Sequence, residues 1–371
     1  RNVNMYLKDY IDKYKNENLT KESFFGPDAA LLALFSLCDL NNIIPPNKAI
    51  KFKDAMIKQN EIHKTKKLGL LLPLSITHAL EDASISKRYR SIKIHDSYTY
   101  INEDEITQTT IFQMDLKDET TIVVFGGTDD TIVGWKEDYD LIYGEVVPCL
   151  KHSLDYVNTR LRSDRKYIFV GHSKGGMEAL YAGLLHEKYQ HNVLEIISLD
   201  GPGFVDSILE TLNKSPYKHK ARLIVPDGSV VGRIFKQPID YTIVYSNEYG
   251  LLQHNPLSWK ILGHEFGVVP SFREGTEKLS KTINETAATF SVEELKEFEK
   301  DFFDTLSSGG SKCLLDTPFH FFSIQKAFVS LSLKQKKLFL KFMSYIIDSR
   351  LVSKDIMFPS IRIKYNKDKQ D

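Results

Sequence analysis

The sequence has no excess of charge of either sign. Lysine and arginine together number 49, and so do aspartate and glutamate, in a chain of 371 residues. Proteins that bind nucleic acid or anionic membranes by electrostatic attraction concentrate positive charge. We therefore expect no nucleic-acid partner and at most transient contact with a membrane surface, so the ligand must be inferred from a specific site.

Cysteine is scarce as well. Cys38, Cys149 and Cys313 are odd in number, lie far apart and form no C-x-x-C pair. This pattern excludes a disulfide scaffold and a cysteine-based zinc site, and it favours a reducing, cytoplasmic location.

Long apolar runs are also lacking. No run reaches the roughly 18 residues that a membrane-spanning helix needs, and the longest candidate, Leu68–Leu80, is broken by Pro73. It is therefore predicted to be a core element. The chain begins with Arg1 rather than methionine, which leaves room for an upstream segment that has been removed.

Hydrophobic periodicity divides the chain into a helical N-terminal region (1–88), an α/β core (89–270) and a helical C-terminal region (271–371). In the core, apolar strands alternate with helical stretches, which predicts a mostly parallel sheet. The stretch Thr109–Met114 is expected to form a hairpin with Thr120–Phe125. Ligand sites in such folds lie at the carboxyl ends of the parallel strands.

Further local features support the division. Asp28 is predicted to cap a buried helix that begins at Ala29. Ser91–His95 and Tyr98–Ile101 are predicted to be separate strands. Ser291 begins a capping box, and a final helix is expected from about Leu333 to Ile347.

The pattern Gly171-x-Ser173-x-Gly175 lies between an apolar β-forming run and an apolar helical run. This strand–turn–helix context is the one in which G-x-S-x-G forms a nucleophile elbow. The alternative is a glycine-rich turn in which the serine only caps the helix. We favour Ser173 as a nucleophile.

An oxyanion intermediate needs two N–H donors, one from the residue after the nucleophile and one from a neighbouring loop. The first candidate is Lys174. The second lies in the loop 126–130 after an apolar strand, where Thr128 is preferred over Gly127. Trp135, further along, is as consistent with a core position as with a substrate wall.

Four stretches resemble the Mbeg-like family, a mainly bacterial group of lipase-like α/β hydrolases: Phe125–Asp138, Gly171–Gly176, Asp200–Phe204 and Gln253–Trp259. The resemblance extends from about Asp28 to the C-terminal helices. More distantly, the first stretch is similar to the F-R-G-T…W-x-x-D region of class 3 lipases. Gly126 stands where both families usually have arginine, and Met177 stands where asparagine usually follows the double glycine. Neither change removes a catalytic group.

A serine nucleophile requires a base and an orienting acid, in the chain order Ser, Asp or Glu, then His. His254 follows the last predicted strand, and the resembling family has a histidine there. His264 is the alternative base, while His172 is expected to be structural because it points away from the serine along its strand.

Two aspartates could orient the histidine. Asp200 follows the strand after the elbow helix and matches the family's D-G-P-G-F, at the position of the acid in pancreatic-type lipases. Asp227 follows the next strand, at the position of the acid in class 3 lipases. Asp200 is the preferred candidate because the family motif covers it, and Asp227 remains the alternative.

The sequence therefore predicts an α/β-hydrolase fold with helical N- and C-terminal additions. The expected function is a serine hydrolase that cleaves a carboxylic ester through an acyl-enzyme, with no metal or organic cofactor. The resemblance alone implies a lipid or phospholipid acyl ester. The alternatives are a thioesterase or acyltransferase on the same triad and a non-catalytic module that binds a partner through its C-terminal helices.

Overall fold

The computed structural model describes residues 4–38, 40–41, 43–62, 75–128, 134, 137–138, 140, 147–277, 281, 284, 291–307, 310, 329, 331–333 and 336. Trp135, the first part of Leu68–Leu80 and most of the predicted final helix lie outside these residues. The strands and loops that carry the predicted triad residues lie inside them.

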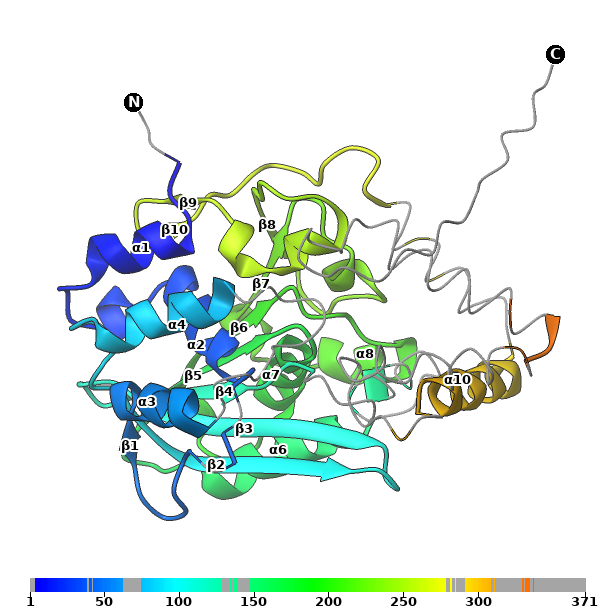
Figure 1. The fold of residues 1–371 in the computed structure, drawn as a ribbon, viewed down its shortest axis with the longest axis horizontal. Coiled ribbons are helices and arrows are strands. Elements are labelled where there is room, and N and C mark those ends of the chain that lie inside the picture. Colours follow the sequence, from blue (N-terminus) through cyan, green and yellow to red (C-terminus); the bar gives the residue numbers. More distant parts are fainter. Residues whose placement is uncertain are drawn as a thin grey trace.

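The described residues form an eight-stranded sheet in which every strand lies beside its neighbours in sequence (Figure 1). Pairing is antiparallel from β1 to β4 and parallel from β4 to β8. The predicted hairpin is confirmed as β3–β4. A separate ribbon pairs β9 with β10. The strands are β1 (Ile50–Lys51), β2 (Lys93–Asn102), β3 (Thr107–Asp115), β4 (Thr120–Phe125), β5 (Lys166–His172), β6 (Val193–Leu199), β7 (Ala221–Pro226), β8 (Tyr241–Val244), β9 (Ile261–Leu262) and β10 (Glu265–Phe266).

Helices cover both faces of the sheet (Figure 1). Helix α2 packs against β4, β5 and β6 on one face, and α7 packs against the same three strands on the other. The α-helices of the described residues are α1 (Leu7–Tyr14), α2 (Gly26–Phe35), α3 (Phe52–Ile62), α4 (Ser75–Ile85), α6 (Pro148–Arg160), α7 (Lys174–Leu185), α8 (Asp206–Asn213) and α10 (Val292–Ser307).

The two faces have separate hydrophobic cores. In β4, Ile122 and Val124 belong to the core under α2, whereas Val123 and Phe125 belong to the core under α7. Successive side chains of a strand point to opposite faces, so a strand buried on both sides has to be apolar throughout. This explains the uninterrupted apolar runs of the central strands and confirms the α/β class.

Two features of the sheet edge differ from the prediction. The predicted strands Ser91–His95 and Tyr98–Ile101 form one strand, β2, which continues through a register shift between His95 and Tyr98. Asp96 adopts a φ of 55° there, as expected of the extra residue in a bulge. Strand β1 was not predicted because two residues are too short to show alternation.

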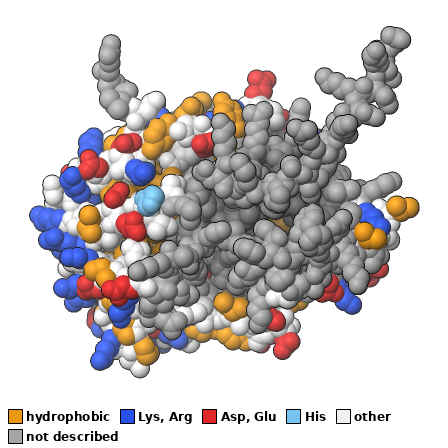
Figure 2. Space-filling view, in the orientation of Figure 1, with side chains coloured by type: hydrophobic (Ala, Val, Ile, Leu, Met, Phe, Trp, Pro, Cys, Tyr) orange, Lys and Arg blue, Asp and Glu red, His pale blue; other side chains and the backbone are white. Residues whose placement is uncertain are grey.

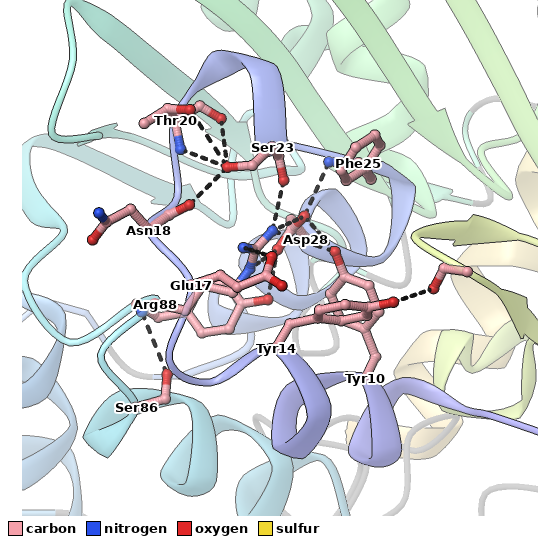
Figure 3. A network of polar contacts seen from close by, with 12 residues as sticks. Tyr10, Tyr14, Glu17, Asn18, Thr20, Ser23, Phe25, Asp28, Ser86 and Arg88 are labelled. Atoms are coloured by element: carbon pink, nitrogen blue, oxygen red, sulfur yellow. Dashed lines mark hydrogen bonds and ion pairs between the residues drawn. The ribbon is translucent and has the colours of Figure 1, made fainter.

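Asp28 is not the N-cap of α2. Phe25 occupies that position, and Asp28 Oδ2 accepts a hydrogen bond from the Phe25 N–H at 3.0 Å. The Asp28 carboxylate also receives Arg88 Nε at 2.9 Å, Tyr10 OH at 2.9 Å and Tyr89 OH at 2.6 Å. This buried network ties α1 and α2 to the segment after α4 (Figure 3). The sequence pattern of a helix cap shows only local contacts, so it could not reveal that Asp28 binds Arg88 and Tyr89.

At the C-terminal end, the capping box of α10 is confirmed. Ser291 N–H donates to Glu294 Oε2 at 3.1 Å, and Glu294 N–H donates to Ser291 Oγ at 3.2 Å. No helix in the described ranges combines the length and apolar character needed to cross a bilayer. On the face shown in Figure 2, basic and acidic side chains are interspersed over the N-terminal helices.

Candidate active site

The turn between β5 and α7 has the geometry of a nucleophile elbow. Ser173 is the N-cap of α7 and adopts φ 60° and ψ −130°, a conformation that costs a non-glycine residue strain and persists only where the surroundings impose it. Its N–H donates to Leu199 O of β6 at 2.9 Å. The serine thus sits at the carboxyl end of a central strand, and the predicted α/β-hydrolase fold is confirmed.

The glycines around Ser173 are required by close backbone contacts. A Cβ on Gly171 would lie 1.9 Å from Gly175 O, and one on Gly175 would lie 2.1 Å from Phe125 O. Real atoms do not approach so closely, so the first turn of α7 passes against β4 and β5 only because both positions lack a side chain.

The predicted oxyanion loop lies beside the elbow. A Cβ on Gly127 would be 2.9 Å from His172 O and 3.6 Å from Ser173 Cβ. Hydrogen bonds hold the residues on either side of Gly127, since Gly126 N–H donates to Thr110 O at 2.7 Å and Thr128 Oγ1 donates to Asp138 Oδ2 at 2.5 Å. Thr128 and Lys174 as oxyanion donors remain predictions.

Asp200 and His254 meet at the carboxyl ends of the parallel strands. Asp200 follows β6, and His254 ends a short 3-10 helix (Gly250–His254) after β8. His254 Nδ1 lies 2.7 Å from Asp200 Oδ2, and both side chains are buried. An Nδ1–H donated to the carboxylate leaves Nε2 free to accept a proton. This is the tautomer that a general base for Ser173 needs.

Hydrogen bonds hold the Asp200 carboxylate in place. Its Oδ1 accepts from Ser229 Oγ and from the Gly232 N–H, the latter at 3.1 Å. Its own N–H donates to Ile224 O at 2.8 Å. With Oδ1 occupied in this way, Oδ2 is directed at His254.

Asp227, the alternative acid, is engaged elsewhere. Its carboxylate oxygens lie 2.9 and 3.0 Å from Nη2 of Arg273, and Oδ2 also accepts from Arg273 Nε at 3.3 Å. The alternative base His264 stacks on Tyr14 and Phe25, with ring centroids 4.4 and 5.1 Å away. The geometry therefore brings together Asp200 and His254 and leaves the two alternatives outside the pair.

His172 supports the His254 loop. Its Nε2 donates to the His254 carbonyl oxygen at 2.7 Å, and the two rings pack with centroids 4.4 Å apart. Burial and the neighbouring His254 hold the pKa of His172 well below its usual range, so the ring is neutral. Among the described atoms, no hydrogen bond joins Ser173 Oγ to the His254 ring, and such bonds are often long in free enzymes.

A buried charged cluster that sequence reasoning missed lies behind the elbow. Lys174 Nζ is 3.0 Å from Glu137 Oε2, and both side chains are almost fully buried. Burial lowers the pKa of Lys174, but Glu137, Asp138 and other nearby groups together raise it above its ordinary value. Burial raises the pKa of Glu137, but Lys174 and nearby hydrogen bonds lower it overall. Both groups are charged, and the only signal in the sequence was a lysine next to the nucleophile.

Glu178, one turn along α7, is a neutral member of this cluster. Its Oε2 accepts from Thr109 Oγ1 at 2.9 Å and from Ser153 Oγ at 2.5 Å, while within the described part of the chain no hydrogen-bond partner meets its Oε1. Burial, only partly offset by Lys174, raises the pKa of Glu178 to about 8. The carboxyl is therefore protonated at neutral pH.

Replacement of Glu178 by glutamine should change how stability depends on pH. In the unfolded chain Glu178 loses its proton near its ordinary pKa of 4.5, whereas the folded protein keeps it until about pH 8. The free energy of unfolding of the wild type should therefore fall as pH rises between these values, by up to about 1.4 kcal/mol per unit from this group.

Glu178→Gln removes that titration, so its stability relative to wild type should improve from pH 5 to pH 8. Urea unfolding at four pH values measures this difference. The exposed Glu187→Gln is the control and should follow the wild-type profile. Parallel profiles for wild type and Glu178→Gln would contradict a neutral buried carboxyl.

Comparison with known proteins places the chain in a family. A search of curated protein sequences gave no match. Among solved structures, the chain is similar to one described as the crystal structure of M37 lipase, with 14% sequence identity, 59% of this chain and 71% of that chain covered, and a TM-score of 0.32. The sequence model of the Mbeg1-like family matches residues 83–304, which is more than half of the chain and includes the elbow, Asp200 and His254. The protein therefore belongs to the Mbeg1-like family.

Proposed function

We propose that the protein is a serine hydrolase that cleaves a carboxylic ester, with Ser173 as nucleophile, His254 as base and Asp200 as orienting acid. The observation that carries this proposal is the buried 2.7 Å contact between His254 Nδ1 and Asp200 Oδ2, on a loop that His172 anchors to the strand leading into Ser173. A strained serine whose general base is an imidazole oriented by a buried carboxylate is the arrangement that activates a hydroxyl.

The steps of the proposed reaction follow from this arrangement. His254 Nε2 takes the Ser173 hydroxyl proton as Oγ forms a bond to the acyl carbonyl carbon. The oxyanion that results accepts hydrogen bonds from the Thr128 and Lys174 N–H groups. The C–O bond to the alcohol then breaks, and the departing oxygen takes the proton from His254. Water, deprotonated by His254, attacks the acyl-enzyme, and the tetrahedral intermediate collapses to release the acid and restore Ser173.

The proposed substrate is an ester with an apolar acyl group, such as a lipid or phospholipid. The family resemblance is what implies the apolar acyl group. The apolar gap that Met177 lines with Leu150 and Phe204, one helical turn beyond Ser173, has room for about one water molecule and belongs to the core under α7. Met177 is the residue that replaces the asparagine usual at this position in the resembling family. An asparagine would bring a polar amide into this core, so methionine suits the packing here.

A series of p-nitrophenyl esters from acetate to palmitate tests the proposal. We expect release of p-nitrophenol with a rate that varies along the series, because a site that binds an apolar acyl chain discriminates by length at about 1 to 3 kcal/mol per methylene. An acyl thioester measured in parallel separates an esterase from a thioesterase. No hydrolysis of any member would contradict the proposal and favour the non-catalytic binding module.

A further inference from the structure

The side chain of Lys174 runs into the protein instead of into solvent. It is 2% exposed, although lysine is among the residues least often buried and a buried ammonium is costly unless it is fully paired. Its Nζ lies 2.7 Å from Gln108 O, 2.8 Å from Gln108 Oε1 and 3.0 Å from Glu137 Oε2. Each of the three ammonium protons has an oxygen acceptor, so the side chain is fixed at its far end as well as at its backbone.

Glu137 is itself held on several sides. Its Oε1 accepts from Thr107 Oγ1 at 2.7 Å and from the Cys149 N–H at 3.0 Å, and its Oε2 accepts from the Gln108 N–H at 2.8 Å. Thr107 and Gln108 begin β3, and Cys149 lies in the first turn of α6. Glu137 therefore connects the chain that follows the oxyanion loop to a strand and a helix of the packed core.

The side chains of the two residues that supply the proposed oxyanion donors bind two consecutive residues, Glu137 and Asp138. Lys174, whose N–H is one donor, binds Glu137 through its side chain. Thr128, whose N–H is the other, binds Asp138. We propose that the Lys174–Glu137 ion pair is a positioning device that fixes the Lys174 N–H relative to the oxyanion loop during acyl transfer. This inference rests on the proposed function and extends it to residues that do not touch the substrate.

If the Lys174–Glu137 pair served only to stabilise the fold, uncharged side chains could serve as well. Replacing a buried ion pair by uncharged side chains of similar volume is often neutral or stabilising, so such a pair is weak evidence for stability. Oxyanion stabilisation, in contrast, depends on donors that are already in place when charge develops. A side chain clamped by three acceptors restricts the backbone to which it is attached, and this backbone carries the donor.

The double variant Lys174→Met/Glu137→Gln tests the inference, since it removes both charges without leaving either one unpaired. We expect kcat for the preferred p-nitrophenyl ester to fall about 10- to 100-fold with KM within about twofold of wild type, because a displaced donor weakens binding of the transition state and not of the ester. The affinity for phenylboronic acid, which forms a tetrahedral adduct with a reactive serine, should fall by a similar factor.

The buried pair Arg88–Asp28 supplies a matched control. It is equally buried but ties α1 and α2 to the segment after α4 (Figure 3). Arg88→Met/Asp28→Asn should lower Tm while leaving kcat within about twofold of wild type below the unfolding transition. Wild-type kcat and boronate affinity in the Lys174→Met/Glu137→Gln variant would overturn the inference.

Glu137→Asp provides a second, more conservative variant if the double variant does not fold. It keeps the charge, but the side chain is one methylene shorter, so the carboxylate no longer reaches Lys174 Nζ as closely. We expect kcat to fall about 10-fold with KM unchanged. Wild-type kcat in this variant would also overturn the inference. A wild-type protein that hydrolyses no ester and leaves Ser173 unreactive would instead overturn the proposed function.

Discussion

Ser173→Ala is expected to lower kcat for ester hydrolysis by about 10⁶-fold, the size of loss that follows removal of the nucleophile from a complete triad. Alanine keeps the Cβ and the constrained backbone of the elbow, so the loss should appear in kcat while KM and Tm stay close to wild type. Steady-state kinetics on the preferred p-nitrophenyl ester, with a thermal unfolding curve for each protein, measure the effect.

Ser198→Ala is the matched control for that substitution. Ser198 is a buried serine of β6 whose Oγ lies 2.5 Å from the position of a Cβ on Gly176, beneath the elbow. Among the residues that the structure describes, its hydroxyl has no hydrogen-bond partner, so its removal should change kcat by less than about twofold. Equal losses in the two variants would show that the elbow matters only for packing.

Asp200→Asn is expected to lower kcat by about 10⁴-fold. An asparagine of the same shape can present its NH₂ group to His254 Nδ1, which favours the tautomer with the proton on Nε2. That tautomer cannot accept the Ser173 proton. The measurement is kcat at a pH where the wild type is fully active, again with an unfolding curve to exclude loss of the native state.

Asp227→Asn distinguishes between the two candidate acids. Asp227 pairs with Arg273, so its replacement should destabilise the fold while kcat falls less than about 10-fold. A large loss of kcat in Asp227→Asn, with a small loss in Asp200→Asn, would identify Asp227 as the orienting acid instead of Asp200. It would also mean that the 2.7 Å contact of Asp200 serves only to hold its loop.

Local signals in the sequence were sufficient to predict the centre of the fold. A strand buried on both faces must be apolar, and a strained turn between strand and helix needs glycine on both sides, so the β5–Ser173–α7 unit could be predicted from about fifteen consecutive residues. The β3–β4 hairpin was equally local. By contrast, β2 was predicted as two strands because the bulge at Asp96 interrupts its alternation.

The contacts that could not be predicted join residues far apart in sequence. Both Asp200 and Asp227 follow parallel strands. The structure distinguishes them because Asp200 contacts His254 and Asp227 pairs with Arg273. The buried side chain of Lys174 could not be predicted because a lysine is expected to be solvated. Its burial depends on Glu137, which lies 37 positions away and shows no pattern of its own.

Mapping the adduct formed by a serine-directed fluorophosphonate tests the central claim most directly. The reagent labels a serine only when a base has activated its hydroxyl, so the account predicts a single adduct on the peptide that carries Ser173 in the native protein. The adduct should be absent after denaturation and in Ser173→Ala. Native protein that forms no adduct, or an adduct that persists in Ser173→Ala, would contradict the assignment of Ser173 as the nucleophile.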